Sequence, residues 1–357
     1  MRSPSPPRPP HGHRHPFVHA LIFLRCTPAH PSPSSCSYGE PADGNKWPHI
    51  SSSFGAFDLA GFPKAAAWWR RAWWLGAIEA TDAGRPPLDA KTTAAVCYLV
   101  ESWQAGLSNV KGHRILNVYT NLESVRLEIN GVATPHDPVT VGPYDAAQFK
   151  DVAYEDGNVT AICSSTSNGD GGAEHTKFSW GAPAKIVLTI DAPSIRTGTG
   201  SAVYYDGEDV ALLRATVVDA NGVVVHNANT INITFAVTEG PARIVGCSNG
   251  DPADHEPNHV AAHLTYHGLV RVIVKVVEKA TGDDAGRALE ATVNPDAGRG
   301  AFSSSIGHAS AKSFTVTAYG TGLQHGEVEV ALSTDEKDSV LSVAAASVGL
   351  ADVGIGE

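Results

Sequence analysis

The 357-residue sequence lacks the features that would tie it to nucleic acid or to a membrane. It has 37 Asp and Glu against 26 Lys and Arg, and its formal net charge is −11. A nucleic-acid-binding protein normally carries a basic stripe; we find none and expect no nucleic-acid partner. The longest apolar run extends only from Phe17 to Leu24. A membrane-spanning helix needs about 20 such residues, so we expect no membrane span.

Cysteine is also scarce, and its spacing excludes the common small frameworks. The five cysteines stand at positions 26, 36, 97, 163 and 247, and no two of them form a CxxC pair. Zinc-knuckle and thioredoxin-like readings therefore have no support. A chain of this length can build a core without disulfides, so we expect no disulfide framework. The cysteines assign no compartment, and the localisation stays open between secreted, organellar and other sites.

Acidic residues are missing from the first 37 positions, since none precedes Glu40. This leader is rich in Pro, His, Ser and Arg, and repeats such as "SPSPPRPP" resist both helix and sheet. Three interpretations compete: a transit peptide, a weak secretory core in "FVHALIFL", or a disordered or non-native leader. The abrupt change of composition near Tyr38 favours the third, so we expect residues 1–37 to carry no fold.

What the chain does have is a tryptophan-rich helix in "DLAGFPKAAAWWRRAWWL", residues 58–75. Pro63 suits the first helical turn, where its missing N–H costs nothing. Trp69 and Trp73 share a face, with Trp68 and Trp74 on the flanks. Four exposed rings would present roughly 600–1000 Å², more than a soluble monomer tolerates. We expect this helix to pack against a large apolar surface; a sugar-stacking platform is the less favoured alternative.

After residue 88 the pattern predicts β-structure. The segments "RILNVYTN", "SVRLEI" and "VTAICSS" alternate apolar and polar residues. Asn130-Gly131 predicts a hairpin turn of the primed type, because both residues accept positive φ. We expect a β-sandwich over residues 88–190, ending at the strand in "GAPAKIVLTIDAP" and followed by a linker at 191–200.

A second β-domain follows in the same style. "ALLRATVVDANGVVV" predicts two strands joined by Asn221-Gly222, and "INITFAV", "ARIVG" and "LVRVIVKVVE" follow at the spacing of a sandwich. "ALEATV" is a candidate closing strand. We expect an immunoglobulin-like β-sandwich over 200–300, then late strands in "SFTVTAYG" and "EVEVALS" and a poorly ordered tail within 301–357. The predicted fold class is all-β, with two tandem immunoglobulin-like sandwiches.

Several motifs resemble glycoside hydrolase family 2, the β-galactosidase-like enzymes. "YGEP", "SSSFGAFDLAGFPK" and the Trp-rich helix are similar to the end of the family's catalytic (β/α)8 barrel. "CYLVESWQAG", "LNVYTNLESVRLEINGVA" and "GNVTAICSS" resemble its following sandwich, and "DGEDVALLRATVVDANGVVVHNA" and "IVGCSNGDP" its immunoglobulin-like domain. The resemblance implies that residues 38–76 are a C-terminal remnant of the barrel, one loop and a helix. The chain departs from the family before Tyr38 and at Cys97-Tyr98, where a histidine is usual.

The resemblance also implies a reaction, the retaining hydrolysis of O-glycosidic bonds in carbohydrates. That reaction needs two carboxyl groups about 5–5.5 Å apart, held at the ends of rigid barrel strands. Both family glutamates precede the segment that matches Tyr38, so we expect no catalytic residue, no cofactor and no activity of this chain alone. Glu40 matches a rim position and is not expected to be catalytic.

Three settings for these domains remain open. The parent enzyme would take a carbohydrate substrate, and a separately encoded barrel is a possible partner. The alternative from another class is a non-catalytic carbohydrate-binding or adhesion module of tandem immunoglobulin-like domains, because a fold alone does not decide function.

A histidine-rich segment imitates a zinc motif. The segment His255–His259 fits the HExxH pattern, with Glu256 in the place of the base, and His263 and His267 continue its spacing of four. Pro257 would break the helix that the motif requires. We therefore expect a loop followed by a strand, and no metal site.

Acidic turns form the other candidate for metal binding. Asp206, Asp209 and Asp219 lie near predicted turns, and carboxylate oxygens are the ligands that calcium prefers. Acidic turns are usually only solvated, so we expect no calcium site there.

Overall fold

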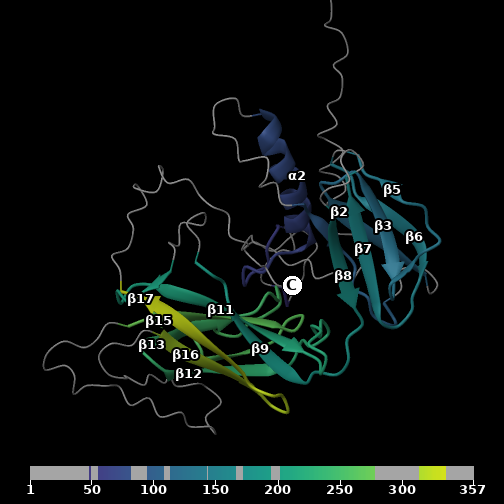
Figure 1. Cartoon of the computed structure of the whole chain (residues 1–357). Coiled ribbons are helices and arrows are strands. Elements are labelled where there is room, and N and C mark those ends of the chain that lie inside the picture. Colours follow the sequence, from purple (N-terminus) through teal and green to yellow (C-terminus); the bar gives the residue numbers. More distant parts are fainter. Residues whose placement is uncertain are drawn as a thin grey trace, which may run out of the picture.

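The computed structural model describes residues 48–49, 55–81, 95–107, 113–142, 144–165, 172–193, 202–277 and 313–334 (Figure 1). Helix α2 covers Ala65–Thr81, with its side chains described through residue 73. The strands are β1 (Cys97–Leu99), β2 (His113–Thr120), β3 (Ser124–Ile129), β4 (Val132–Ala133), β5 (Val139–Thr140), β6 (Ala147–Ala153), β7 (Asn158–Ser164), β8 (Ala173–Phe178), β9 (Lys185–Ile190), β10 (Val203–Tyr204), β11 (Val210–Val218), β12 (Asn232–Glu239), β13 (Ala242–Ser248), β14 (Ala262–Leu264), β15 (Leu269–Val276), β16 (Ser313–Gly320) and β17 (Gly326–Ser333).

Strands β1 to β8 form the first sandwich. One sheet has the order β1-β2-β6, and the other has the order β4-β3-β7-β8 with β5 paired to β3. Their inner faces meet in a core that includes the fully buried rings of Trp103 and Phe149. The Trp103 indole donates a hydrogen bond to the Glu155 carbonyl at 2.9 Å, and the Arg114 guanidinium lies 5.0 Å from the ring centroid.

Strands β9 to β17 form the second sandwich. A five-stranded sheet, β10-β17-β16-β12-β14, faces a four-stranded sheet, β13-β15-β11-β9. The core between them is rich in valine, as the β-branched composition of the strands predicts. The all-β fold class with two sandwiches is therefore confirmed. Among the described residues, no helix is long and apolar enough to cross a membrane.

Local patterns explain several of these elements. Along β3, Val125 and Leu127 are buried while Arg126 between them is exposed, as the alternation predicts. Asn130 and Gly131 have φ values of 49° and 78°, so the primed turn joining β3 to β4 is confirmed.

The second predicted hairpin is only partly formed. Gly222 has a φ of 89°, and the Asp219 N–H donates to the Val223 carbonyl at 2.9 Å, so the chain does turn there. Beyond the turn, however, Val224 makes one isolated bridge to Val218 instead of a second strand.

The boundary expected near residue 190 does not match the strand pairing. The sequence pattern predicts β9 as the last strand of a domain spanning 88–190, but β9 pairs antiparallel with β11, and Ile186 and Leu188 belong to the core of the second sandwich. The crossing between sandwiches therefore lies between Phe178 and Lys185. Alternation identifies a strand without specifying its sheet, because hydrogen-bonded partners are set by long-range packing.

Strands β16 and β17 are central to the second sandwich rather than an addition after it. Strand β16 lies between β12 and β17, and its Phe314, Val316 and Ala318 are fully buried. The expected closing strand "ALEATV" lies outside the described residues, as do the leader, Glu40 and the tail after residue 334.

Helix α2 begins at Ala65, so the prediction that Pro63 occupies its first turn is wrong by two residues. Pro63 instead forms an isolated bridge with Phe57. The Ala67 N–H donates to the Lys64 carbonyl at 2.8 Å, which makes Lys64 the entry residue of the helix.

The cysteine spacing gives no support for a disulfide framework, but the structure contains one disulfide. Cys97 on β1 and Cys163 on β7 form a disulfide that joins the two sheets of the first sandwich, 66 residues apart in sequence. Cys247, the remaining cysteine among the described residues, is buried and free. A widely spaced pair carries no sequence signature of its own, because only the fold brings the two β-carbons together.

Replacing Cys97 and Cys163 by alanine should lower the free energy of unfolding by about 2–5 kcal/mol, because the reduced unfolded chain gains conformational freedom. Urea titration with and without dithiothreitol measures this loss. The Cys247→Ala variant is the matched control and should keep its sensitivity to the reductant. If dithiothreitol leaves the midpoint of the wild-type urea transition unchanged, that result would contradict the assignment of the disulfide.

Candidate functional site

The segment that carries the "DLAGFPK" motif forms a compact turn, here named the entry loop (residues 56–64). The Asp58 N–H donates to the Phe62 carbonyl at 2.9 Å, and the Phe62 N–H donates to Asp58 Oδ1 at 2.8 Å. Gly61 has a φ of 82°, a conformation that glycine adopts without strain. Burial raises the pKa of the Asp58 carboxyl, although the backbone hydrogen bonds it accepts act in the opposite direction.

Arg271 on β15 fastens the entry loop to the second sandwich. Its Nε donates to the Ala60 carbonyl at 2.5 Å, and its guanidinium carbon lies 4.6 Å from the centroid of the Phe62 ring. Its Nη1 also pairs with the Asp191 carboxylate. Arg271 and Phe62 are buried, with 9% and 4% of their surface exposed. A planar guanidinium can make these in-plane and stacking contacts together.

Gly250, in the loop after β13, fixes the position of the same segment. A β-carbon there would lie 2.0 Å from Asp58 Oδ2 and 3.0 Å from the Asp58 β-carbon. Since real β-carbons essentially never approach other atoms so closely, a side chain at position 250 would require the Asp58 carboxylate to move, and glycine avoids this.

Helix α2 packs on the first sandwich through aromatic contacts. The rings of Trp68 and Tyr98 stack at 4.9 Å with an interplanar angle of 8°, and Tyr98 also contacts His175 at 4.9 Å. Trp73 contacts Tyr144 at 5.4 Å. In Figure 1 the helix lies beside β2. The side chains of Trp68, Trp69 and Trp73 are half-buried, and that of Trp74 lies outside the described residues.

The HExxH segment is not a helix. Turns, bends and irregular residues fill positions 252 to 261, and His263 lies on β14, so the loop and strand predicted from Pro257 are what the structure contains. The histidines do not converge on one point, and two of them contact different backbone carbonyl groups. His255 Nε2 lies 2.7 Å from the Pro48 carbonyl, and His267 Nδ1 lies 3.1 Å from the His226 carbonyl.

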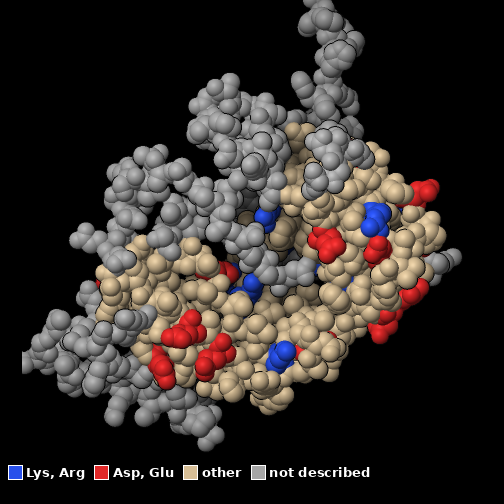
Figure 2. Space-filling model, in the orientation of Figure 1, with Lys and Arg blue, Asp and Glu red and all other residues tan. Residues whose placement is uncertain are grey.

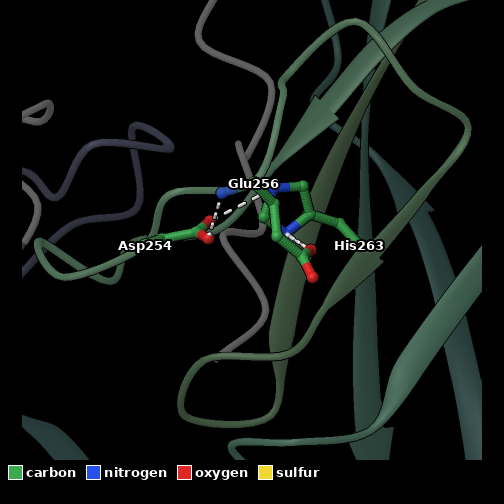
Figure 3. Close-up of side chains that lie close together, drawn as sticks. All are labelled: Asp254, Glu256 and His263. Atoms are coloured by element: carbon green, nitrogen blue, oxygen red, sulfur yellow. Dashed lines mark hydrogen bonds and ion pairs between the residues drawn. The ribbon is translucent and has the colours of Figure 1, made fainter.

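The fold instead brings Asp254, Glu256 and His263 together (Figure 3). His263 Nε2 lies 3.1 Å from Asp254 Oδ2, and its Nδ1 lies 3.5 Å from Glu256 Oε2. The His263 side chain is fully buried, whereas those of Asp254 and Glu256 are 16% and 44% exposed. The sequence does not reveal this group, because a loop and a strand, rather than one face of a helix, bring the three residues together.

A buried thiol lies near the same carboxylates. Burial raises the pKa of Cys247 to about 12, and the negative charges of Glu256 and Asp254 add to the effect. The thiol lies 3.1 Å from the Val260 carbonyl, to which it donates. Cys247 is therefore a protonated core residue at neutral pH, not a reactive thiolate.

The acidic turns considered for calcium are structural caps. Asp206 Oδ1 accepts hydrogen bonds from the Glu208 and Asp209 N–H groups at 2.8 Å. Burial opposes the ionisation of Asp219, but the N–H groups of Gly181 and other residues that donate to its carboxylate lower its pKa below the ordinary value. Within the described ranges, these aspartates form no group with the spacing of metal ligands.

The surface charge agrees with the acidic composition. In the face drawn in Figure 2, acidic side chains are scattered over both sandwiches and outnumber the basic ones. No basic stripe crosses the described part of this face.

The sequence is similar to glycoside hydrolases. Residues 197–284 match the family model for glycoside hydrolase family 2 C-terminal domain 5. The chain is 28% identical over 239 residues to the beta-galactosidase BoGH2A of Bacteroides ovatus, an alignment that covers 66% of this chain and 24% of that protein.

Solved structures share the fold. A beta-glycosidase from Bacteroides vulgatus superimposes with a TM-score of 0.57 at 20% identity, covering 80% of this chain and 29% of that one. A family 2 glycosyl hydrolase from Bacteroides cellulosilyticus gives a TM-score of 0.56 at 18% identity, covering 85% and 34%. The chain thus spans about a quarter to a third of the length of these proteins.

The described architecture is that of the β-sandwich region found in β-glycosidases. The resemblance to glycoside hydrolase family 2 is confirmed: residues 197–284 match a C-terminal domain of that family, and the chain is similar to part of a beta-galactosidase.

Substituting Gly250 by alanine should destabilise the protein by about 1–3 kcal/mol, because the added methyl group overlaps the Asp58 side chain. Chemical denaturation measures the change, and hydrogen exchange should show lost protection at the Phe62 amide. Gly142→Ala is the matched control, since nothing lies within 4 Å of a β-carbon there. Equal effects of the two substitutions would contradict the close approach.

Proposed function

We propose that this chain is the C-terminal part of a retaining β-glycosidase, in which residues 38–76 end the catalytic barrel and the two sandwiches hold that end in place. The substrate class of the parent enzyme is a β-linked carbohydrate. The observation that carries the proposal is the attachment of the entry loop and α2 to both sandwiches.

The contacts of this attachment join distant parts of the chain. The hydrogen bond from Arg271 to the Ala60 carbonyl spans 211 residues, and the stack of Trp68 on Tyr98 reaches the first sandwich. Burying a guanidinium costs free energy unless its partners are fixed. A free-standing binding module has no need to bury a cation in order to hold such a segment. These contacts hold the "DLAGFPK" segment, which by the resemblance leads into the last barrel helix.

Support of a barrel is a different task from catalysis. Retaining hydrolysis needs an acid/base and a nucleophile about 5–5.5 Å apart, and the resemblance assigns both to sequence that precedes the match to Tyr38. In this proposal the sandwiches contribute position and rigidity, while the reacting carboxyl groups belong to the barrel. We therefore expect no hydrolysis by this chain alone.

The chain alone should release no p-nitrophenol from p-nitrophenyl β-galactoside or β-glucuronide above the rate of a blank. Glu40→Gln is the matched variant, because Glu40 is the carboxylate of the barrel-like "YGEP" motif. Turnover that is retained through purification and lost in Glu40→Gln would show that this chain carries its own catalytic group, against the proposal.

Two further measurements separate this function from its rivals. Translation of the DNA upstream of the Tyr38 codon in all three frames should give barrel strands with two glutamates, and pull-down from native extract would detect a separately encoded barrel instead. Selective glycan-array binding by the chain, with neither of these found, would favour the carbohydrate-binding or adhesion module.

A further inference from the structure

His263 is a buried side chain with an unsatisfied nitrogen. Its imidazole is 0% exposed, and Nε2 has no hydrogen-bond partner among the described residues. Asp254 Oδ2 lies 3.1 Å from Nε2, close enough for an ion pair, but the contact does not satisfy hydrogen-bond geometry. A buried polar nitrogen without a satisfactory partner calls for an explanation, and an unplaced ion is one of the few available.

The surroundings of His263 supply further ligand atoms. Each of Asp254, Glu256 and His263 offers one, and these atoms all lie within 4.8 Å of one another. Figure 3 shows both carboxylates beside the imidazole, each close to a different ring nitrogen. Two acidic groups from one short loop thus converge on a histidine of the adjoining strand.

We propose that Asp254, Glu256 and His263 bind a divalent transition-metal ion, with Zn²⁺ as the best-suited ion. Zinc binds imidazole nitrogen and carboxylate oxygen at about 2.0–2.2 Å, so two ligands of one ion lie roughly 3.0–3.5 Å apart. The 3.1 Å between His263 Nε2 and Asp254 Oδ2 falls in that range. Glu256 Oε2 lies nearer to Nδ1, so in this proposal the partly exposed Glu256 side chain turns toward Asp254 to complete the site.

The second nitrogen of His263 fits this role. When a metal takes one imidazole nitrogen, the other carries the proton and donates it to a carbonyl or carboxylate. The Leu264 carbonyl lies 3.4 Å from His263 Nδ1 and can accept it. Asn249 Nδ2 lies 3.3 Å from Nδ1 and would keep its stronger bond to the Leu264 carbonyl, at 2.9 Å.

Charge and access agree with a cation site. Two carboxylates beside a buried imidazole concentrate negative charge, which a divalent ion offsets. Because the Glu256 side chain is 44% exposed, an ion can enter from solvent at that carboxylate. This inference is independent of the proposed glycosidase function, since it rests on a loop and a strand of the second sandwich alone.

Isothermal titration of chelator-treated protein with ZnCl₂ tests the site. The full chain is used without a histidine tag, and with His11, His13 and His15 changed to glutamine, because the leader offers a competing set of histidines. We expect one Zn²⁺ per chain, with affinity lowered by about tenfold or more in Asp254→Asn, Glu256→Gln and His263→Gln.

The HExxH histidines provide the matched controls. His255→Gln and His259→Gln change exposed side chains of the same loop and should leave the affinity within about twofold of the parent. If His263→Gln fails to fold by circular dichroism, the partly exposed Asp254 and Glu256 still carry the test. Absence of saturable binding, or equal losses in the control variants, would overturn the proposal.

Discussion

The buried guanidinium of Arg271 is the contact on which the arrangement of this molecule depends. It binds the Ala60 carbonyl, covers the Phe62 ring and pairs with Asp191, so one side chain joins the entry loop to β15 and to the end of β9. A buried cation is tolerated only when its donors are matched. Each of these partners must therefore be in place, and the positions of three distant segments become coupled.

Two other constraints extend this coupling. Gly250 leaves room for Asp58, and the stack of Trp68 on Tyr98 continues the attachment onto the first sandwich. The Cys97–Cys163 disulfide ties together the two sheets of that sandwich, next to the stacked Tyr98. The entry loop and α2 are thus held by contacts with both sandwiches, each of which has its own hydrophobic core. The terminal segment of a larger barrel would need to be held in this way.

Elements that depend on neighbouring residues could be predicted from the sequence. Pairings between distant residues could not. Alternation located β3, and Asn130-Gly131 specified its turn, because both depend on neighbours in sequence. The same alternation could not assign β9 to its sheet or pair Cys97 with Cys163, since those contacts are formed only by the folded chain. The Asp254, Glu256 and His263 group was missed for the same reason: a loop and a strand bring it together, without a helical repeat.

Hydrogen exchange at the entry loop, compared between Arg271→Met and the exposed-site control Arg243→Met, tests this account most directly. Methionine keeps much of the packing volume but removes the donors. We expect the amides of Gly61, Phe62 and Lys64 to lose protection by roughly tenfold or more in Arg271→Met, with no change in Arg243→Met. Unchanged protection in a folded Arg271→Met protein would contradict the account, because the loop would then be held by something other than the guanidinium.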